Sequence, residues 1–236
     1  MARLIAIEGI DGSGKGTQTS LLVNALNAQE IRTGTMQFPR YSATYFGAAI
    51  GSFLNGKFGS LQQVHPQLAS VLYAGDRFES KPVLQQLMAD HDVVVLDRFV
   101  GSNLAHQGAK LAGDERRELV KWIETIEFEV FRLPQPDYTI LIDMSSAWSH
   151  ELVRRKATRD YTDKTADLQE ADSPYLERVR QCYLEIAADR DSWKIIRGLT
   201  DDGQLRSVDH IAADILKFVS ERLSSPQGTV TPETVS

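Results

Sequence analysis

The chain has 236 residues and a mass of 26.3 kDa, a size at which an α/β fold often forms a single domain. Hydrophobic residues make up 42% and charged residues 25%, the balance of a globular protein, and no apolar run is long enough to cross a bilayer. The formal net charge of −6 and the pI of about 5.4 disfavour nucleic-acid binding, which usually needs a basic face. The single cysteine, Cys182, excludes an intramolecular disulfide framework. No secretory signal precedes the first strand-like segment, so we expect a cytoplasmic protein.

Short apolar runs rich in β-branched residues alternate with segments of helical period. We expect strands at residues 4–7, 32–37, 93–96, 138–142 and 193–196. We expect helices from about residue 15 and at residues 62–88, 114–131, 146–157, 173–188 and 207–223, with Pro66 and Pro82 starting, kinking or breaking the second. This alternation predicts one domain over residues 1–223, built on a parallel five-stranded sheet with helices on both faces. Residues 224–236 are polar, contain two prolines and are predicted to be a disordered tail.

The segment between the first strand and the first helix has the spacing of a phosphate-binding P-loop. It reads Gly9, Ile10, Asp11, Gly12, Ser13, Gly14, Lys15, Gly16 and Thr17. Glycines let backbone N–H groups turn inward around phosphate oxygens, and the helix amino terminus adds unpaired donors. Lys15 would reach the β- and γ-phosphates of ATP. The alternative, a glycine-rich turn with a solvated lysine, does not account for the strand before it and the helix after it.

One position departs from the usual P-loop pattern. Gly16 stands where a serine or threonine normally follows the lysine and binds Mg²⁺, and the next hydroxyl belongs to Thr17. We therefore expect any Mg²⁺ to be held by water and carboxylates rather than by the P-loop directly.

Four further segments appear in an ordered series with the P-loop. They are Phe38-Pro39-Arg40-Tyr41, Tyr73-Ala74-Gly75-Asp76-Arg77, Leu96-Asp97-Arg98-Phe99 and Leu133-Pro134-Gln135-Pro136-Asp137. Together with Glu8 to Lys15, Gly101-Ser102-Asn103 and Ile126-Glu127-Phe128, this series resembles the thymidylate kinases, especially the actinobacterial ones. The resemblance implies a P-loop NTPase fold with a mobile lid, transfer of the γ-phosphoryl group of ATP to dTMP, a Mg²⁺ cofactor and a homodimer.

The resemblance assigns an acceptor site for dTMP. In the family an aromatic residue stacks on thymine, and an arginine four positions later hydrogen-bonds the base. The corresponding residues here are Tyr73 and Arg77. Without the resemblance, a core tyrosine and a surface arginine would be the simpler interpretation. Arg40, after Phe38, would hold the acceptor phosphate, although a surface arginine on a turn is an equal alternative. The other implied contacts are Asp11 with the sugar 3′-hydroxyl, Ser102 and Asn103 with the nucleotide, and His106 near the sugar 2′ position.

The resemblance also assigns the residues of phosphoryl transfer. Arg98 would bridge the donor γ-phosphate and the acceptor phosphate, and Asp97 would orient an arginine or Mg²⁺-bound water. A structural ion pair is the alternative for both. Residues 154–170 match the lid that closes over ATP, with Arg155 and Arg159 as the catalytic or ATP-binding cations. Asp11 and Glu170 are the candidate metal ligands.

Three other functions compete with this interpretation. Another nucleoside monophosphate kinase shares the Gly-Lys-Gly-Thr run of the P-loop. A GTPase-like switch is disfavoured because the Asn-Lys-x-Asp guanine motif is missing from the sequence. An inactive scaffold is disfavoured because Lys15, Arg98 and the lid arginines are all present.

Overall fold

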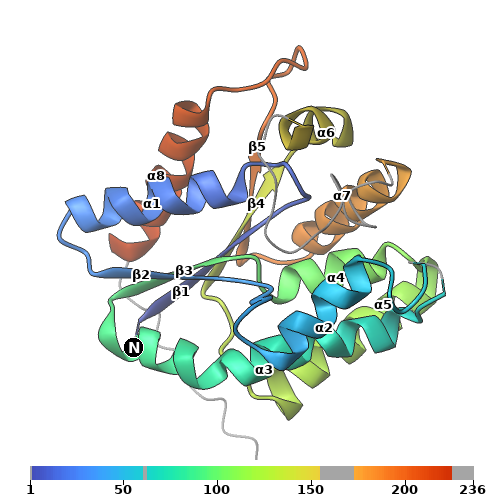
Figure 1. The fold of residues 1–236 in the computed structure, drawn as a ribbon. Coiled ribbons are helices and arrows are strands. Elements are labelled where there is room, and N and C mark those ends of the chain that lie inside the picture. Colours follow the sequence, from blue (N-terminus) through green and yellow to red (C-terminus); the bar gives the residue numbers. More distant parts are fainter. Residues whose placement is uncertain (1, 61–62, 155–172, 225–236) are drawn as a thin grey trace, which may run out of the picture.

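A computed structural model describes residues 2–60, 63–154 and 173–224. Within these residues one sheet has five parallel strands in the order β2-β3-β1-β4-β5 (Figure 1). The strands are β1 (Arg3–Glu8), β2 (Thr33–Gln37), β3 (Val93–Asp97), β4 (Tyr138–Asp143) and β5 (Trp193–Arg197). Each strand lies where the sequence predicted one.

The helices that the structure describes cover both faces of the sheet. They are α1 (Lys15–Ala28), α2 (Tyr45–Leu54), α3 (Pro66–Asp90), α4 (Val100–Gly108), α5 (Gly113–Glu124), the π-helix η1 (Thr125–Val130), α6 (Ser146–Arg154), α7 (Ser173–Ala188) and α8 (Val208–Ser224). None of them, within the described ranges, has the length and apolar character needed to span a membrane.

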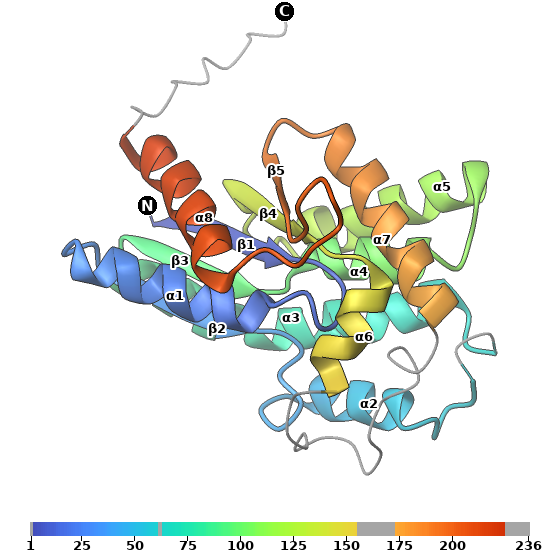
Figure 2. The same ribbon diagram turned by 90° about the horizontal axis from the view of Figure 1, so that it is seen from above.

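Alternation along the strands sends side chains to two separate cores. Ile5 and Ile7 of β1 join a cluster with α1 and α8, whereas Leu4 and Ala6 join a larger cluster with α3, α4 and α7. Figure 1 shows α1 and α8 on one side of the sheet and α3, α4 and α7 on the other, and Figure 2 shows α1 and α8 next to each other from above. Because every central strand is buried on both faces, its sequence reads as a continuous apolar run.

The helix predictions need five corrections. The sequence did not predict α2 or α4. The helix expected from residue 62 begins at Pro66, whose missing N–H suits a first turn, and it continues through Pro82. The helix expected at residues 114–131 changes to a π-helix after Glu124. Ser224, assigned to the tail, is the last residue of α8; residues 155–157 and 225–236 lie outside the described residues.

Sheet topology places two functional segments side by side. β1 pairs with β3, and Ile7 lies opposite Asp97. The P-loop follows β1 and the Asp97-Arg98 pair ends β3, so both emerge at the same carboxyl edge of the sheet. Ligands of open α/β sheets bind at this edge.

Candidate active site

The P-loop is arranged as an anion cradle. Gly14, the N-cap of α1, has φ of 91°, a left-handed conformation open to glycine, and no side chain caps the helix. The first N–H groups of α1 are therefore available to an anion. Ser13 Oγ is buried and has no hydrogen-bond partner among the described residues. These groups fit the phosphates of a nucleotide.

Lys15 closes the loop from inside. Its Nζ donates to the Ile10 carbonyl at 2.8 Å and the side chain is buried. Burial, reinforced by the positive charge of Arg98, lowers the pKa of Lys15 to about 8. A triphosphate beside Lys15 would add its negative charge to that of the nearby carboxylates and favour the ammonium form.

Asp97 faces the P-loop at the position where the usual hydroxyl is missing. A Cβ placed on Gly16 would lie 3.1 Å from Asp97 Oδ2, so the carboxylate approaches the loop directly. Thr17 is exposed on the first turn of α1. Within the described residues, no group of three or more His, Cys, Asp or Glu side chains could hold a metal by itself. This arrangement fits Mg²⁺, which commonly uses one or two carboxylates with water and phosphate oxygens.

Arg98 lies between the P-loop and a neighbouring pocket. Its Nη2 donates to Asp11 Oδ1 at 2.5 Å, and its Nη1 donates to the Gly9 carbonyl at 3.2 Å and to Ser102 Oγ at 3.0 Å. Burial alone would lower the pKa of Arg98, but Asp11 and the other nearby acidic groups outweigh it and hold the pKa well above its usual value. Arg98 is thus a permanent, partly buried cation.

The backbone of Arg98 is left-handed, with φ of 65°. Such a conformation costs a non-glycine residue about 1–3 kcal/mol and is often retained at functional sites. The Arg98 N–H donates to the Ile7 carbonyl at 3.0 Å, which continues the ladder between β1 and β3 for one more residue. The chain therefore turns sharply at the point where the guanidinium meets the P-loop.

A pocket opens beside Arg98, between α2, α3 and α4. The residues that line it are Asp11, Phe38, Pro39, Tyr41, Leu54, Tyr73, Arg77, Arg98, Phe99, Ser102, Asn103, His106 and Gln107. The structure therefore brings together most of the predicted acceptor residues, from four separate segments of the chain. Its lining combines aromatic rings with a few polar groups, the composition of a small-molecule site.

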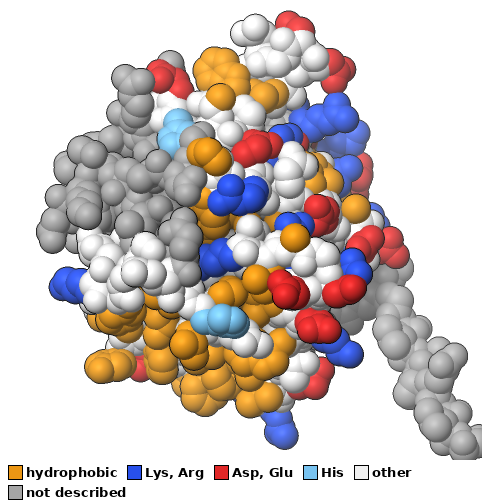
Figure 3. All heavy atoms as spheres, turned by 90° about the vertical axis from the view of Figure 1, so that its right-hand side faces the viewer, with side chains coloured by type: hydrophobic (Ala, Val, Ile, Leu, Met, Phe, Trp, Pro, Cys, Tyr) orange, Lys and Arg blue, Asp and Glu red, His pale blue; other side chains and the backbone are white. Residues whose placement is uncertain are grey.

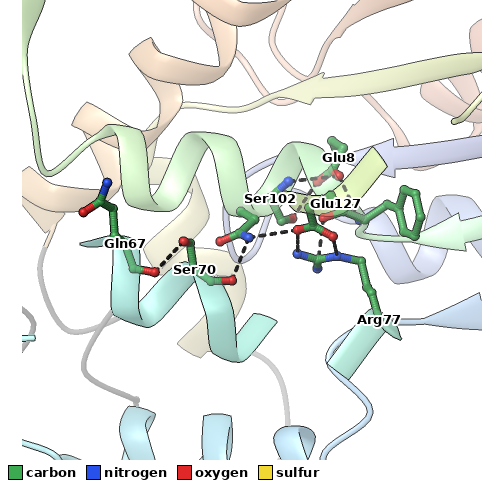
Figure 4. Close-up of polar contacts among 8 residues, drawn as sticks. Glu8, Gln67, Ser70, Arg77, Ser102 and Glu127 are labelled. Atoms are coloured by element: carbon green, nitrogen blue, oxygen red, sulfur yellow. Dashed lines mark hydrogen bonds and ion pairs between the residues drawn. The ribbon is translucent and has the colours of Figure 1, made fainter. Parts of the chain in front are cut away.

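Arg77 is fixed within this pocket by Glu127. Arg77 Nε donates to Glu127 Oε2 at 2.8 Å, and a second hydrogen bond joins Nη2 to Oε1 (Figure 4). Asn103 Nδ2 donates to the same carboxylate at 3.0 Å. Glu127 lies in the π-helix, and the sequence did not predict its role because its partner is fifty residues earlier in the chain.

Two neighbouring side chains of α4 reach the pocket. His106 is buried, and burial together with the charge of Arg98 lowers its pKa to about 3, so its ring is neutral. Gln107 is fully buried, and neither its amide oxygen nor its amide nitrogen has a hydrogen-bond partner among the described residues. An unpaired buried amide is costly, so Gln107 is a further candidate for ligand binding. The sequence did not indicate it.

Arg40 is not in the pocket lining. Its backbone N–H donates to Asp76 Oδ2 at 3.0 Å, and its guanidinium donates to Ser80 Oγ at 3.3 Å. Asp76 also accepts from Thr44, the N-cap of α2, so the turn is held against α3. Phe38 packs its ring 5.8 Å from that of Phe99 in the pocket wall. The predicted lid residues Arg155 and Arg159 and the predicted metal ligand Glu170 lie outside the described residues.

Comparison with known proteins decides the family. A sequence model described as thymidylate kinase matches residues 7–204. This chain belongs to the thymidylate kinase family. The thymidylate kinase of Mycobacterium tuberculosis (strain CDC 1551 / Oshkosh) is 34% identical over 204 residues, 86% of this chain and 94% of that protein. A thymidylate kinase of Bifidobacterium longum subsp. infantis is 30% identical over 188 residues, 78% of this chain and 73% of that protein.

A solved structure of thymidylate kinase from Candida albicans has the same fold. The TM-score is 0.69 at 24% sequence identity, covering 94% of this chain and 92% of that chain. The fold predicted from the strand and helix pattern, a P-loop NTPase with a parallel sheet, is thereby confirmed.

Proposed function

We propose that this chain is an ATP:dTMP phosphotransferase whose acceptor site is the pocket beside Arg98. The observation that carries the proposal is the place of the Arg98 guanidinium, which contacts Asp11 and Gly9 of the P-loop and Ser102 of the pocket. A donor phosphate on the P-loop and an acceptor phosphate in the pocket would meet at this cation. Family membership supports the same activity, since the relatives above are named thymidylate kinase.

The pocket suits thymine at its far end. Tyr73 offers an aromatic face, and Arg77, held by Glu127, offers a donor at the edge of a base. Gln107 offers one donor and one acceptor, the pair needed by the adjacent N–H and carbonyl of a pyrimidine. Ser102, Asn103 and His106 also line the pocket and would contact the sugar and phosphate of the acceptor.

The proposed chemistry is an in-line transfer that needs no general base. The acceptor phosphate is already an anion at neutral pH, so catalysis consists of positioning and neutralising charge. Lys15 would stabilise the donor phosphates, and Arg98 would stabilise the phosphoryl group in the transition state of its transfer. Arg40 would turn from Ser80 toward the acceptor phosphate, while Asp11 would meet the sugar 3′-hydroxyl. Arg155 and Arg159 of the predicted lid would bind ATP and exclude water.

Mg²⁺ is the proposed cofactor. Asp97, which faces Gly16, is the described carboxylate best placed to hold it through water, and Asp11 and Glu170 remain candidates from the sequence. When bound, the ion would neutralise charge on the β- and γ-phosphates.

We further propose that the enzyme is a cytoplasmic homodimer. Leu68, Phe78 and Val83 of α3 are exposed, and the ring of Phe78 lies 4.6 Å from that of Phe131, next to the exposed Val130. Figure 3 shows hydrophobic side chains gathered on the lower part of one face, at the level of α2 and α3 in Figure 1. Such a patch favours a second copy of the chain as its cover. Light scattering should give twice the chain mass, and Leu68→Glu should give a monomer; a monomeric wild type would contradict the dimer.

A coupled assay of ADP release tests the substrate. Mg²⁺ and ATP are supplied with dTMP, dUMP, UMP, CMP or AMP in turn. We expect dTMP to give the highest kcat/KM, because Arg77 and Gln107 match a pyrimidine edge. A preference for AMP, UMP or CMP would keep the phosphotransferase and reject the base assignment, whereas no turnover with any acceptor would favour a nucleotide-binding switch.

A further inference from the structure

Glu8, the last residue of β1, organises the start of α4. Its carboxylate is fully buried, and Oε1 accepts hydrogen bonds from the N–H groups of Phe99 at 2.8 Å and Ser102 at 3.0 Å. Phe99 is the N-cap of α4 and has no side-chain cap of its own. Glu8 therefore acts as the cap of this helix from more than ninety residues away.

Ser102 connects this cap to Arg98. Its hydroxyl donates to Glu8 Oε2 at 2.6 Å and accepts from Arg98 Nη1 at 3.0 Å. Figure 4 shows Glu8 and Ser102 turned toward one another at the start of α4. A serine hydroxyl has one proton, and here that proton is donated to Glu8. The lone pairs of the Ser102 oxygen are therefore left to accept from the Arg98 guanidinium. Glu8 is thus connected to Arg98 through a single hydroxyl.

Tyr183 of α7 completes the cluster. Its hydroxyl lies 2.9 Å from Glu8 Oε2 and 2.9 Å from Ser102 Oγ, and its side chain is buried. Burial, with the charge of Glu8, raises the pKa of Tyr183 well above its usual value, so the phenol remains a donor. The ring is fixed by packing against His106 and Trp193. Tyr183 does not line the acceptor pocket.

We propose that Tyr183 is a positioning residue for phosphoryl transfer, whose hydroxyl locks Glu8 and Ser102 so that they hold the Arg98 guanidinium against the P-loop. This role rests on the proposed function of Arg98. Without the phenol, Glu8 Oε2 loses one of its two donors, and the Ser102 hydroxyl keeps its bonds to Glu8 and Arg98 but loses the neighbouring hydroxyl that confines both groups. A guanidinium displaced by a fraction of an ångström would still bind phosphate but would stabilise the transferring group less well.

The test compares Tyr183→Phe with Tyr175→Phe. Tyr175 lies on the same helix and is equally buried, but the hydrogen bonds that its hydroxyl makes to described residues go to the His106 carbonyl at 2.7 Å and to His106 Nδ1 at 3.5 Å, not to Glu8, Ser102 or Arg98. Each variant loses one buried hydroxyl, so both should lose a similar amount of thermal stability. We expect Tyr183→Phe to lower kcat about 10-fold with the KM for ATP nearly unchanged, and Tyr175→Phe to keep kcat within about two-fold.

Two further readouts separate positioning from general destabilisation. In an Arg98→Ala background, Tyr183→Phe should have little additional effect on kcat, because the group that it positions is gone. In NMR spectra of arginine side chains, assigned with Arg98→Lys, the guanidinium signals of Arg98 should show faster rotation in Tyr183→Phe and not in Tyr175→Phe.

Several results would overturn the role of Tyr183. These are an unchanged kcat in Tyr183→Phe, an equal loss in Tyr175→Phe, the same loss in the Arg98→Ala background, or unchanged Arg98 signals. The NMR measurement requires no turnover, so it tests the positioning role even if the wild type fails to phosphorylate dTMP, which would contradict only the proposed function.

Discussion

The guanidinium of Arg77 is paired with the carboxylate of Glu127 in the interior of the protein. Both side chains are almost completely buried, at 2% and 0% exposure, and two hydrogen bonds join them. A planar guanidinium held in this way has one defined orientation before any ligand arrives. Glu127 thus neutralises Arg77 and presents it to the pocket.

Removing the carboxylate should therefore be costly. Glu127→Ala leaves Arg77 as an unpaired buried charge, and we expect the free energy of unfolding to fall by about 3–5 kcal/mol. The matched control is Asp114→Ala, which breaks the exposed pair with Arg117 and should have almost no effect. Chemical denaturation measures both. Similar small losses in the two variants would show that the buried pair does not hold Arg77 in place.

Replacing Gln107 by an apolar residue should lower activity without lowering stability. Gln107→Leu removes an amide that has no hydrogen-bond partner among the described residues, so stability should be unchanged or slightly higher. The kcat/KM for dTMP should fall about 10- to 100-fold, because a base would lose its polar partner. Steady-state kinetics and a thermal melt are sufficient. A destabilised variant with unchanged kinetics would make Gln107 structural.

Gly75 sets the distance between α2 and α3. A Cβ on Gly75 would lie 2.6 to 2.8 Å from the ring of Phe46, whereas a Cβ on Gly51 would meet only Tyr41 at 3.7 Å. Overpacking in Gly75→Ala should cost about 1–3 kcal/mol, which cancels or exceeds the roughly 1 kcal/mol gained in helix propensity, so the variant should not be stabilised. Gly51→Ala should be neutral or stabilising. Equal effects on unfolding would show that the helices are not in close contact at Gly75.

The lowered pKa of Lys15 predicts that the protein takes up a proton when it binds ATP. Burial holds its pKa near 8, below the ordinary value of 10.5, so Lys15 is largely neutral in the free protein at pH 9. Phosphate charge should raise that pKa, and calorimetry in two buffers of different ionisation enthalpy should detect proton uptake at pH 9 but little at pH 7. Lys15→Met should abolish the uptake; uptake that persists in this variant would assign it to another group.

The same lowered pKa affects stability in a defined direction. Between pH 8 and 10.5 the unfolded chain binds a proton on Lys15 that the folded chain has lost. The contribution of this residue to the free energy of unfolding therefore rises as the pH rises through that window. The free energy of unfolding of the wild type, minus that of Lys15→Met, should therefore increase as the pH rises from 8 to 10.5.

Local patterns were sufficient for the strands and the P-loop but not for two helices. Apolar runs such as Val93 to Leu96 are buried on both faces, and their composition shows it directly. In α2, Gly47 and Gly51 lower helix propensity and the apolar residues have no clear period, so only its N-cap, Thr44, was a usable signal. The cap of α4 is Glu8, more than ninety residues earlier in the sequence, so the residues around the start of α4 carry no capping signal.

Sequence separation also explains which site residues could be predicted and which could not. Tyr73, Arg77, Arg98, Ser102, Asn103 and His106 stand in segments that resemble a known family, and all of them line the pocket. Glu127 also stands in such a segment, but its role, like that of Tyr183, depends on contacts fifty or more residues away, which a single sequence does not reveal. Gln107 was missed because a buried amide without a partner is recognisable only in the folded protein.

The rate of dTDP formation by Arg98→Ala tests the central claim most directly. Wild type is compared with this variant and with Arg32→Ala, which breaks the exposed pair with Asp92 and leaves the site intact. We predict that wild type and Arg32→Ala convert dTMP at the same rate with ATP and Mg²⁺, while Arg98→Ala is slower by about 10³-fold or more in kcat. An Arg98→Ala variant that keeps wild-type turnover would contradict the placement of phosphoryl transfer at Arg98.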